Sequence, residues 1–207
     1  MNKIENIIFD FGGVLYDIDL EKSINAFKTL GFDLPKFKDL LLPVFLDLEV
    51  GKISPSSFVK NLQMHSSDQF TEKDILHAFN IILTGIDSEK VADLRKIKTK
   101  YQLFLLSNTN EIHYNIFSKE IKSTKSTADF YDLFKKEYYS HKLGMRKPDL
   151  SIFEYVLTDS ILDPFGTLFV DDSYENISAA ESLGIQTFLI ENSDSWKKLL
   201  FKLKVKL

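Results

Sequence analysis

Polar residues that could act together in catalysis close three of the short apolar runs in this sequence. Asp10 interrupts the run "IIFDFGGVL", Ser107 and Asn108 end "LFLLSN", and Asp171 and Asp172 end "LFVDD". A carboxylate buried at the end of an apolar run costs free energy unless a partner compensates for it. One such acid could be a simple helix N-cap, but three coinciding run ends indicate a shared site.

The three acids Asp10, Asp171 and Asp172 would repel one another at a shared site unless a cation neutralised them. A few oxygen ligands of this kind favour Mg²⁺, which keeps positions for water and phosphate. Mg²⁺ polarises phosphoryl oxygens, and a neighbouring carboxylate can then attack phosphorus. The Ser107 hydroxyl could donate to a phosphate oxygen, and Lys147 in "GMRKPD" could supply a fixed positive charge. These residues predict a site for phosphoryl chemistry.

The apolar runs predict the sheet that must position these residues. Each run is too short for a helix and is apolar on both alternating faces, as strands covered on both sides by helices are. The predicted strands are Asn6–Phe11, Tyr101–Asn108, Gly166–Asp172 and Ile185–Ile190. Helical segments lie between them, so we expect an α/β fold with a doubly wound parallel sheet, a Rossmann-like core. In such sheets the ligand site lies beyond the carboxyl ends of the strands.

Consecutive helical patterns interrupt this alternation between Tyr16 and Asp87. Ser54 with Pro55, and Thr71 with Asp74, have the residue types that begin helices. We expect an inserted helical-bundle cap at residues 16–87 and a core formed by residues 1–15 and 88–207. The segment Glu49–Ser54 is interpreted as a surface turn of this cap, with a turn facing the site as the alternative.

A second irregular stretch, "SKEIKSTKSTADFYD", covers residues 118–132. Its polar composition predicts a surface loop.

The order of these motifs resembles that of the haloacid dehalogenase superfamily, in the phosphatase branch with a helical cap after the first motif. The family's first motif, hhhhDxDG[TV][LV], corresponds to "IIFDFGGVL", and its strand ending in Ser or Thr corresponds to "LFLLSN". Its lysine, often in R-K-P, corresponds to "GMRKPD", and its acidic pair corresponds to "LFVDDSYEN". The resemblance covers essentially the whole chain.

The resemblance implies a Mg²⁺ site and a nucleophile. Asp10 would form an aspartyl-phosphate and would also ligate Mg²⁺. The backbone carbonyl of Gly12 and the carboxylate of Asp171 would be the other protein ligands. Asp172 would act through water or hold Lys147.

The resemblance also implies how phosphate is bound. The Ser107 hydroxyl and the amide of Asn108 would bind phosphate oxygens. Lys147 would neutralise both the nucleophile and the phosphate, which makes it a catalytic residue. Asn176 is interpreted as a capping residue of the following helix or as a residue that orients the acidic loop.

Gly12 is the departure from the family pattern. Most phosphatases of the superfamily have a second Asp there, which protonates the leaving alcohol and later activates water. General acid–base catalysis is typically worth about 10²–10⁴-fold in rate. A subgroup with DxGxV at this position acts on sugar 1-phosphates, and its resemblance suggests a small phosphorylated metabolite, such as a sugar phosphate, as substrate.

Two other functions remain open from the residues alone. The chain could be a metal-independent 2-haloacid dehalogenase, since those relatives also lack the second Asp, although they do not need the adjacent acids Asp171 and Asp172. It could instead be a phosphate-binding regulator or pseudo-enzyme that has kept the site without turnover.

Composition narrows the class of protein. The chain of 207 residues has a formal net charge of −4, with Lys and Arg scattered, so no nucleic-acid surface is expected. No apolar run reaches the length of a membrane helix, and there is no signal-peptide pattern. The absence of cysteine excludes disulfides and thiolate sites. We expect a cytoplasmic protein without a membrane partner; nothing in the sequence indicates its oligomeric state.

Overall fold

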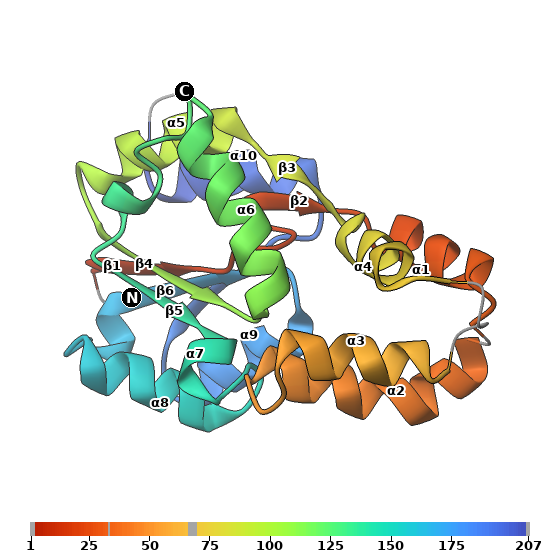
Figure 1. Ribbon diagram of the computed structural model, residues 1–207. Helices are drawn as coiled ribbons and strands as arrows, with labels where there is room; N and C mark the ends of the chain where they lie inside the picture. Colours follow the sequence, from red (N-terminus) through yellow and green to blue (C-terminus); the bar gives the residue numbers. More distant parts are fainter. Residues whose placement is uncertain (1–2, 33, 66–69, 206–207) are drawn as a thin grey trace.

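The computed structural model describes residues 3–32, 34–65 and 70–205. Its centre is a five-stranded sheet in the order β5-β4-β1-β6-β7, with every neighbouring pair parallel (Figure 1). The strands are β1 (Asn6–Phe9), β4 (Gln102–Ser107), β5 (Lys136–Tyr139), β6 (Thr167–Asp171) and β7 (Gln186–Leu189). The predicted fold class, a doubly wound parallel α/β sheet with inserted helices, is confirmed.

Helices cover both faces of the sheet. Successive side chains of a strand point to opposite faces, and both faces are apolar here. Ile7 and Phe9 of β1 belong to one apolar cluster and Ile8 to the other. The first face is covered by α5 (Ser88–Lys98), α6 (Glu111–Ser123) and α10 (Ser193–Lys202). The second is covered by α8 (Leu150–Asp159) and α9 (Tyr174–Ser182) (Figure 1). Burial on both faces explains why β1 is apolar throughout.

Four helices form a separate body beside the sheet (Figure 1). They are α1 (Leu20–Thr29), α2 (Leu34–Glu49), α3 (Pro55–Gln63) and α4 (Glu72–Asn80), here called the cap helices. Their apolar faces make a third cluster that includes Phe27, Phe58 and Phe79. The expected helix starts are confirmed: Ser54 caps α3, and Thr71 caps α4.

The chain passes to and from the cap helices through two short strands that the sequence did not predict. β2 (Tyr16–Ile18) and β3 (Leu83–Ile86) pair antiparallel. Strand β5 was also missed, because its sequence "KEYY" is half polar, as an edge strand can be. The surface loop expected at residues 118–132 is wrong for its first six residues, which are the last part of α6.

No helix among the described residues is long and apolar enough to cross a membrane.

His113 of α6 joins the core to the cap helices. Its ring stacks on Phe79 of α4 with the ring centroids 4.1 Å apart. Its Nε2 lies 3.2 Å from the Phe79 carbonyl oxygen, and its Nδ1 lies 3.2 Å from the Asn110 side-chain nitrogen. Burial lowers the pKa of His113 to about 4. The neutral imidazole therefore donates from Nε2 and accepts at Nδ1.

We expect the free energy of unfolding to fall as the pH drops from about 6.5 to about 4, because the unfolded chain then binds a proton that buried His113 does not. Chemical denaturation at pH 7.5 and pH 5 measures this. The loss should be smaller in His113→Gln by about 1–2 kcal/mol. An equal loss in both proteins would contradict the assignment to His113, since His141, whose pKa burial also lowers to about 4, is unchanged in the variant.

Candidate active site

The register of the sheet brings three of the predicted site residues together. β1 is the central strand, and Phe9 pairs with Leu105 of β4 and with Val170 of β6. Asp10 follows Phe9, and its amide donates to the Val170 carbonyl at 2.8 Å. Asp10 therefore lies between the carboxyl ends of β4 and β6, which end in Ser107 and Asp171.

Lys147 joins two of these strand ends. Its ammonium donates to Asp10 Oδ1 at 2.6 Å, to Asp171 Oδ2 at 2.7 Å and to the Leu106 carbonyl at 3.0 Å. Lys147 is 1% exposed and Asp171 is fully buried. A buried charge is tolerated only when it is paired and hydrogen-bonded. The two ion pairs of Lys147, with Asp10 and with Asp171, therefore allow all three side chains to be charged while buried.

Asn108 fixes the loop that carries Lys147. Its side-chain nitrogen donates to the Lys147 carbonyl at 2.8 Å, and its side-chain oxygen accepts from the Lys147 amide at 2.9 Å. The side chain of Asn108 thus positions the lysine, while its backbone remains at the end of β4 beside Ser107. Ser107 is 1% exposed and lines the neighbouring cavity.

Asn176 orients the acidic loop, which is one of the two roles considered for it. Its side-chain nitrogen donates to Asp171 Oδ1 at 2.9 Å, and the Ser173 amide donates to the same oxygen at 2.8 Å. The cap of α9 is Ser173, so the capping interpretation of Asn176 is wrong. With Lys147 on its other oxygen, Asp171 is held at both ends of its carboxylate.

Asp172 packs beside Gly13. A Cβ on Gly13 would overlap the Asp172 carboxylate, and the φ of Gly13 is +77°, a conformation that side chains disfavour. Gly13 is therefore required on two counts. The alternative role of Asp172, a direct contact with Lys147, does not occur, because the protein partners of that ammonium are Asp10, Asp171 and a backbone carbonyl.

The charges of the cluster act on one another strongly. Burial raises the pKa of Asp10 to about 7; Lys147 opposes this shift, and Asp171 and Asp172 add to it. Burial alone would lower the pKa of Lys147, but Asp10 and Asp171 outweigh burial and raise it. The ammonium therefore stays charged between the carboxylates.

The donor set fits a divalent cation. Oxygens of Asp10, Asp171 and Asp172 all lie within 4.8 Å of one another. When all three carboxylates are ionised, they exceed the single positive charge of Lys147 by two, which one Mg²⁺ would balance. Carboxylate oxygens are the ligands that Mg²⁺ prefers. The Gly12 carbonyl belongs to the same loop as Asp10.

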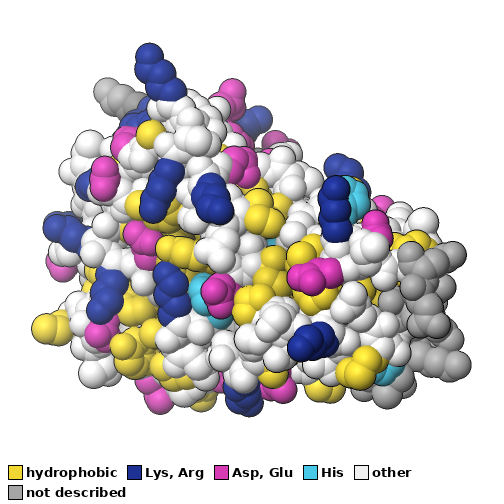
Figure 2. Space-filling view, in the orientation of Figure 1, with side chains coloured by type: hydrophobic (Ala, Val, Ile, Leu, Met, Phe, Trp, Pro, Cys, Tyr) yellow, Lys and Arg dark blue, Asp and Glu magenta, His cyan; other side chains and the backbone are white. Residues whose placement is uncertain are grey.

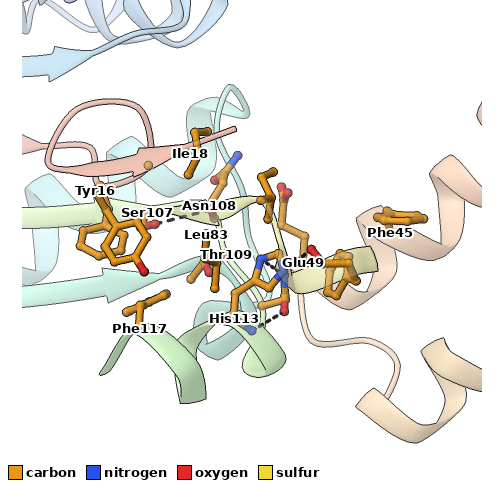
Figure 3. A pocket seen from close by; sticks show the side chains of 15 residues that line it. Tyr16, Ile18, Phe45, Glu49, Leu83, Ser107, Asn108, Thr109, His113 and Phe117 are labelled. Carbon is orange, nitrogen blue, oxygen red and sulfur yellow. Dashed lines mark hydrogen bonds between the residues drawn. The ribbon is translucent and has the colours of Figure 1, made fainter. Parts of the chain in front are cut away.

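A cavity of about 290 Å³ opens beside this cluster. Figure 3 shows its two sides: Ser107, Asn108 and Thr109 extend from the end of β4, and Phe45 approaches from α2. Its remaining lining includes residues that the sequence analysis did not select: Phe11, Tyr16, Ile18, Glu49, Phe79, Ile82, Leu83, Asn110, His113 and Phe117. Periodicity could not find them, because it does not distinguish a helix face turned to a cavity from one packed on a neighbour.

Glu49 gave the clearest signal among these missed residues. It begins the segment "EVGKIS", whose glycine lies between two helices. The preferred interpretation of Glu49–Ser54 as a plain surface turn is wrong for Glu49, which ends α2 and lines the cavity; Gly51, Lys52 and Ser54 are exposed.

The chain is similar to known enzymes over almost its whole length, although no protein-family model matches it. It is 36% identical to the D-ribitol-5-phosphate phosphatase of Bacteroides thetaiotaomicron, over 95% of this chain and 97% of that protein. The structure of an HAD family enzyme from the same organism, in complex with magnesium and inorganic phosphate, matches with a TM-score of 0.84 and 36% identity, covering 95% of this chain and 98% of that one.

A predicted HAD-like family hydrolase from Porphyromonas gingivalis matches with a TM-score of 0.85 and 33% identity, covering 100% of both chains. Relatives this similar over nearly the full length of both proteins share a family with the chain and not only a fold. The chain therefore belongs to the haloacid dehalogenase superfamily, in its phosphatase branch.

Proposed function

We propose that this Mg²⁺-dependent phosphatase hydrolyses phosphate monoesters of small sugars or polyols through an aspartyl-phosphate on Asp10. The observation that carries the proposal is the Lys147 ammonium bonded to both Asp10 and Asp171, within a cluster of carboxylates that fits Mg²⁺. The similarity to a D-ribitol-5-phosphate phosphatase supports the substrate class.

Asp10 has one oxygen suited to attack. Lys147 occupies Oδ1, and among the described residues no donor bonds to Oδ2. Attack by Oδ2 forms an oxygen–phosphorus bond and breaks the bond from phosphorus to the leaving alcohol oxygen. Water then attacks the phosphorus of the aspartyl-phosphate, which releases phosphate and restores the carboxylate of Asp10.

The other site residues bind and neutralise the phosphate. The Ser107 hydroxyl and the Asn108 amide would donate to its oxygens, and Lys147 would offset negative charge on both Asp10 and the phosphoryl group. Asp10, Asp171 and the Gly12 carbonyl would hold Mg²⁺ directly, with Asp172 beside them. When bound, Mg²⁺ neutralises and polarises the phosphoryl oxygens.

The leaving alcohol must take its proton from outside the first motif, because Gly12 has no side chain. The substrate or a solvent chain would supply that proton. A sugar hydroxyl bearing neighbouring oxygens leaves more readily than a simple alcohol, which is consistent with the proposed substrate class.

The family comparison favours phosphatase activity over the two alternatives. The similar proteins with 36% identity are a phosphatase and an enzyme bound to magnesium and phosphate, which fits neither a metal-independent dehalogenase nor a regulator without turnover.

The division into a core at 1–15 and 88–207 and a cap at 16–87 is part of this proposal, with the cap covering the cavity. The apolar cluster of the cap helices supports it as a separate packing unit. Acidic and basic side chains are interspersed on the face in Figure 2, which shows no continuous basic surface. The similarity to a D-ribitol-5-phosphate phosphatase supports a small phosphorylated molecule as the partner. We place the enzyme in the cytoplasm.

Replacing the nucleophile tests the chemistry. Asp10→Asn should lower phosphate release from sugar and polyol phosphates by at least about 10³-fold, because the amide cannot form the aspartyl-phosphate. Steady-state assays with and without Mg²⁺ measure this. Turnover that survives the substitution would remove Asp10 as the nucleophile, and halide release from 2-haloacids without Mg²⁺ would identify a dehalogenase.

Asn176→Ala should raise the Mg²⁺ concentration needed for half-maximal activity by about 10-fold or more, because Asp171 loses a donor that orients it. A Mg²⁺ titration of activity measures the change. The exposed Asn25→Ala in the cap serves as the control and should leave the titration unchanged. Equal curves for the two variants would contradict the role of Asn176.

Gly12→Asp should fold and should speed hydrolysis of alkyl phosphates by up to about 10²-fold relative to aryl phosphates, since poor leaving groups gain most from a general acid. A Cβ at Gly12 would meet only ordinary contacts with Ile18 at 3.8 Å, so the backbone does not require glycine. Rates with phenethyl and p-nitrophenyl phosphate measure this. An unchanged rate ratio in a folded variant would count against this account of Gly12.

A further inference from the structure

Glu49 is the one acidic side chain among the described residues that line the cavity. It is the last residue of α2. Although it is far from Ser107 and Asn108 in the sequence, it lines the same cavity (Figure 3). With phosphate bound at Ser107 and Asn108, as proposed above, this carboxylate would face the part of the substrate beyond the phosphate.

Arg146 orients the carboxylate of Glu49. The Arg146 Nε donates to Glu49 Oε1 at 2.6 Å, and both side chains are about one-quarter to one-third exposed. In the described part of the chain, no donor bonds to Oε2. An ionised carboxylate accepts hydrogen bonds and donates none, so Glu49 offers an acceptor to the cavity. Arg146 precedes Lys147, which ties this acceptor to the loop that carries the active-site ammonium.

The backbone of Glu49 is anchored to the phosphate-binding side of the cavity. The Ser140 hydroxyl oxygen lies 2.7 Å from the Glu49 carbonyl and 2.8 Å from the Thr109 carbonyl, and it accepts from the Thr109 amide at 2.9 Å. Ser140 is fully buried. Gly51 packs so closely on the backbone of His141 that a Cβ would overlap it. The end of α2 is therefore seated on the core at a fixed distance from the end of β4.

Most of the other side chains that line the cavity are apolar, so Glu49 differs from them as a charged acceptor. Phe45 and Phe79 from the cap helices and Phe11 and Phe117 from the core present apolar rings. Rings suit the carbon–hydrogen faces of many leaving groups and do not discriminate strongly among them. A purely aliphatic leaving group would cover Glu49 without a donor, which costs free energy, whereas a hydroxylated one would supply the donor.

Resting on the proposed phosphatase function, we propose that Glu49 is a specificity-determining residue whose carboxylate accepts hydrogen bonds from hydroxyl groups of the substrate's carbon chain. The substrates it selects are polyhydroxylated phosphate monoesters, and those it rejects are phosphates of aliphatic alcohols. Glu49 acts on the leaving group's distal hydroxyls and takes no part in the bond-breaking step at phosphorus.

Two five-carbon esters test the proposal: ribitol 5-phosphate, which has hydroxyls along its chain, and pentyl phosphate, which has none. The measured quantity is the ratio of kcat/KM for the first to kcat/KM for the second, with Mg²⁺ present. In the wild type the ratio should exceed one. In Glu49→Ala it should fall by about 10-fold to 100-fold, mainly through a higher KM for ribitol 5-phosphate, as expected for a lost hydrogen bond to a charged group.

Glu49→Gln keeps the side-chain volume. It replaces the alanine variant if thermal melting shows that Glu49→Ala disturbs the packing of α2 on the core. It should lower the ratio in the same direction by less, because the amide oxygen still accepts. The matched control is Glu21→Gln, an exposed acid on α1 of the cap that lies outside the cavity lining. This control should keep the wild-type ratio.

Each other outcome has a distinct meaning. A wild-type ratio in both Glu49 variants overturns the proposal while the phosphatase function stands. An equal fall on both esters, with p-nitrophenyl phosphate spared, assigns Glu49 to proton transfer at the leaving oxygen and also overturns it. A wild type that releases phosphate from none of the three esters refutes the proposed function itself.

Discussion

The structure depends on one buried ammonium held between two carboxylates from separate strands. Without Lys147, Asp10 and Asp171 would be two like charges at neighbouring strand ends, with little solvent to screen them. With it, the site is charged, rigid and short of positive charge by the amount that one Mg²⁺ carries. Asn108 holds the lysine's backbone and Asn176 holds Asp171, so two amide side chains secure the geometry that the ions alone would not define.

The two glycines after Asp10 have different physical reasons. Gly13 is required by its left-handed backbone and by the Asp172 carboxylate that occupies the place of a side chain. Gly12 has neither constraint, and its surroundings leave room for a larger residue. The fold therefore does not explain this glycine; under the proposed function, the loop would offer a carbonyl to the cation and lack a proton donor at this position. Such a site would favour substrates whose alcohol leaves readily without a proton from the enzyme.

The cavity belongs to both parts of the chain. One end of the cavity is formed by residues that follow the carboxyl ends of strands β1 and β4, and the other end by residues of the cap helices. His113 stacked on Phe79 and Ser140 between Glu49 and Thr109 are the contacts that hold these parts together at the cavity. Under the proposed function, substrate choice and the packing of the cap helices on the core are linked, because His113, Phe79, Glu49 and Thr109 both line the cavity and make the junction.

The sequence by itself determined the apolar strands β1, β4, β6 and β7 of the sheet, the helix starts at Ser54 and Thr71, and the set of residues in the ion cluster. Buried strands show their apolar character in a few adjacent residues, and the acids that close them stand out against it. Only the tertiary structure decided which donor each polar group uses: Asn108 on Lys147, Asn176 on Asp171, Arg146 on Glu49. It also decided that the half-polar segment β5 pairs as an edge strand and which residues line the cavity. These depend on residues far apart in the chain, and local patterns carry no information about such partners.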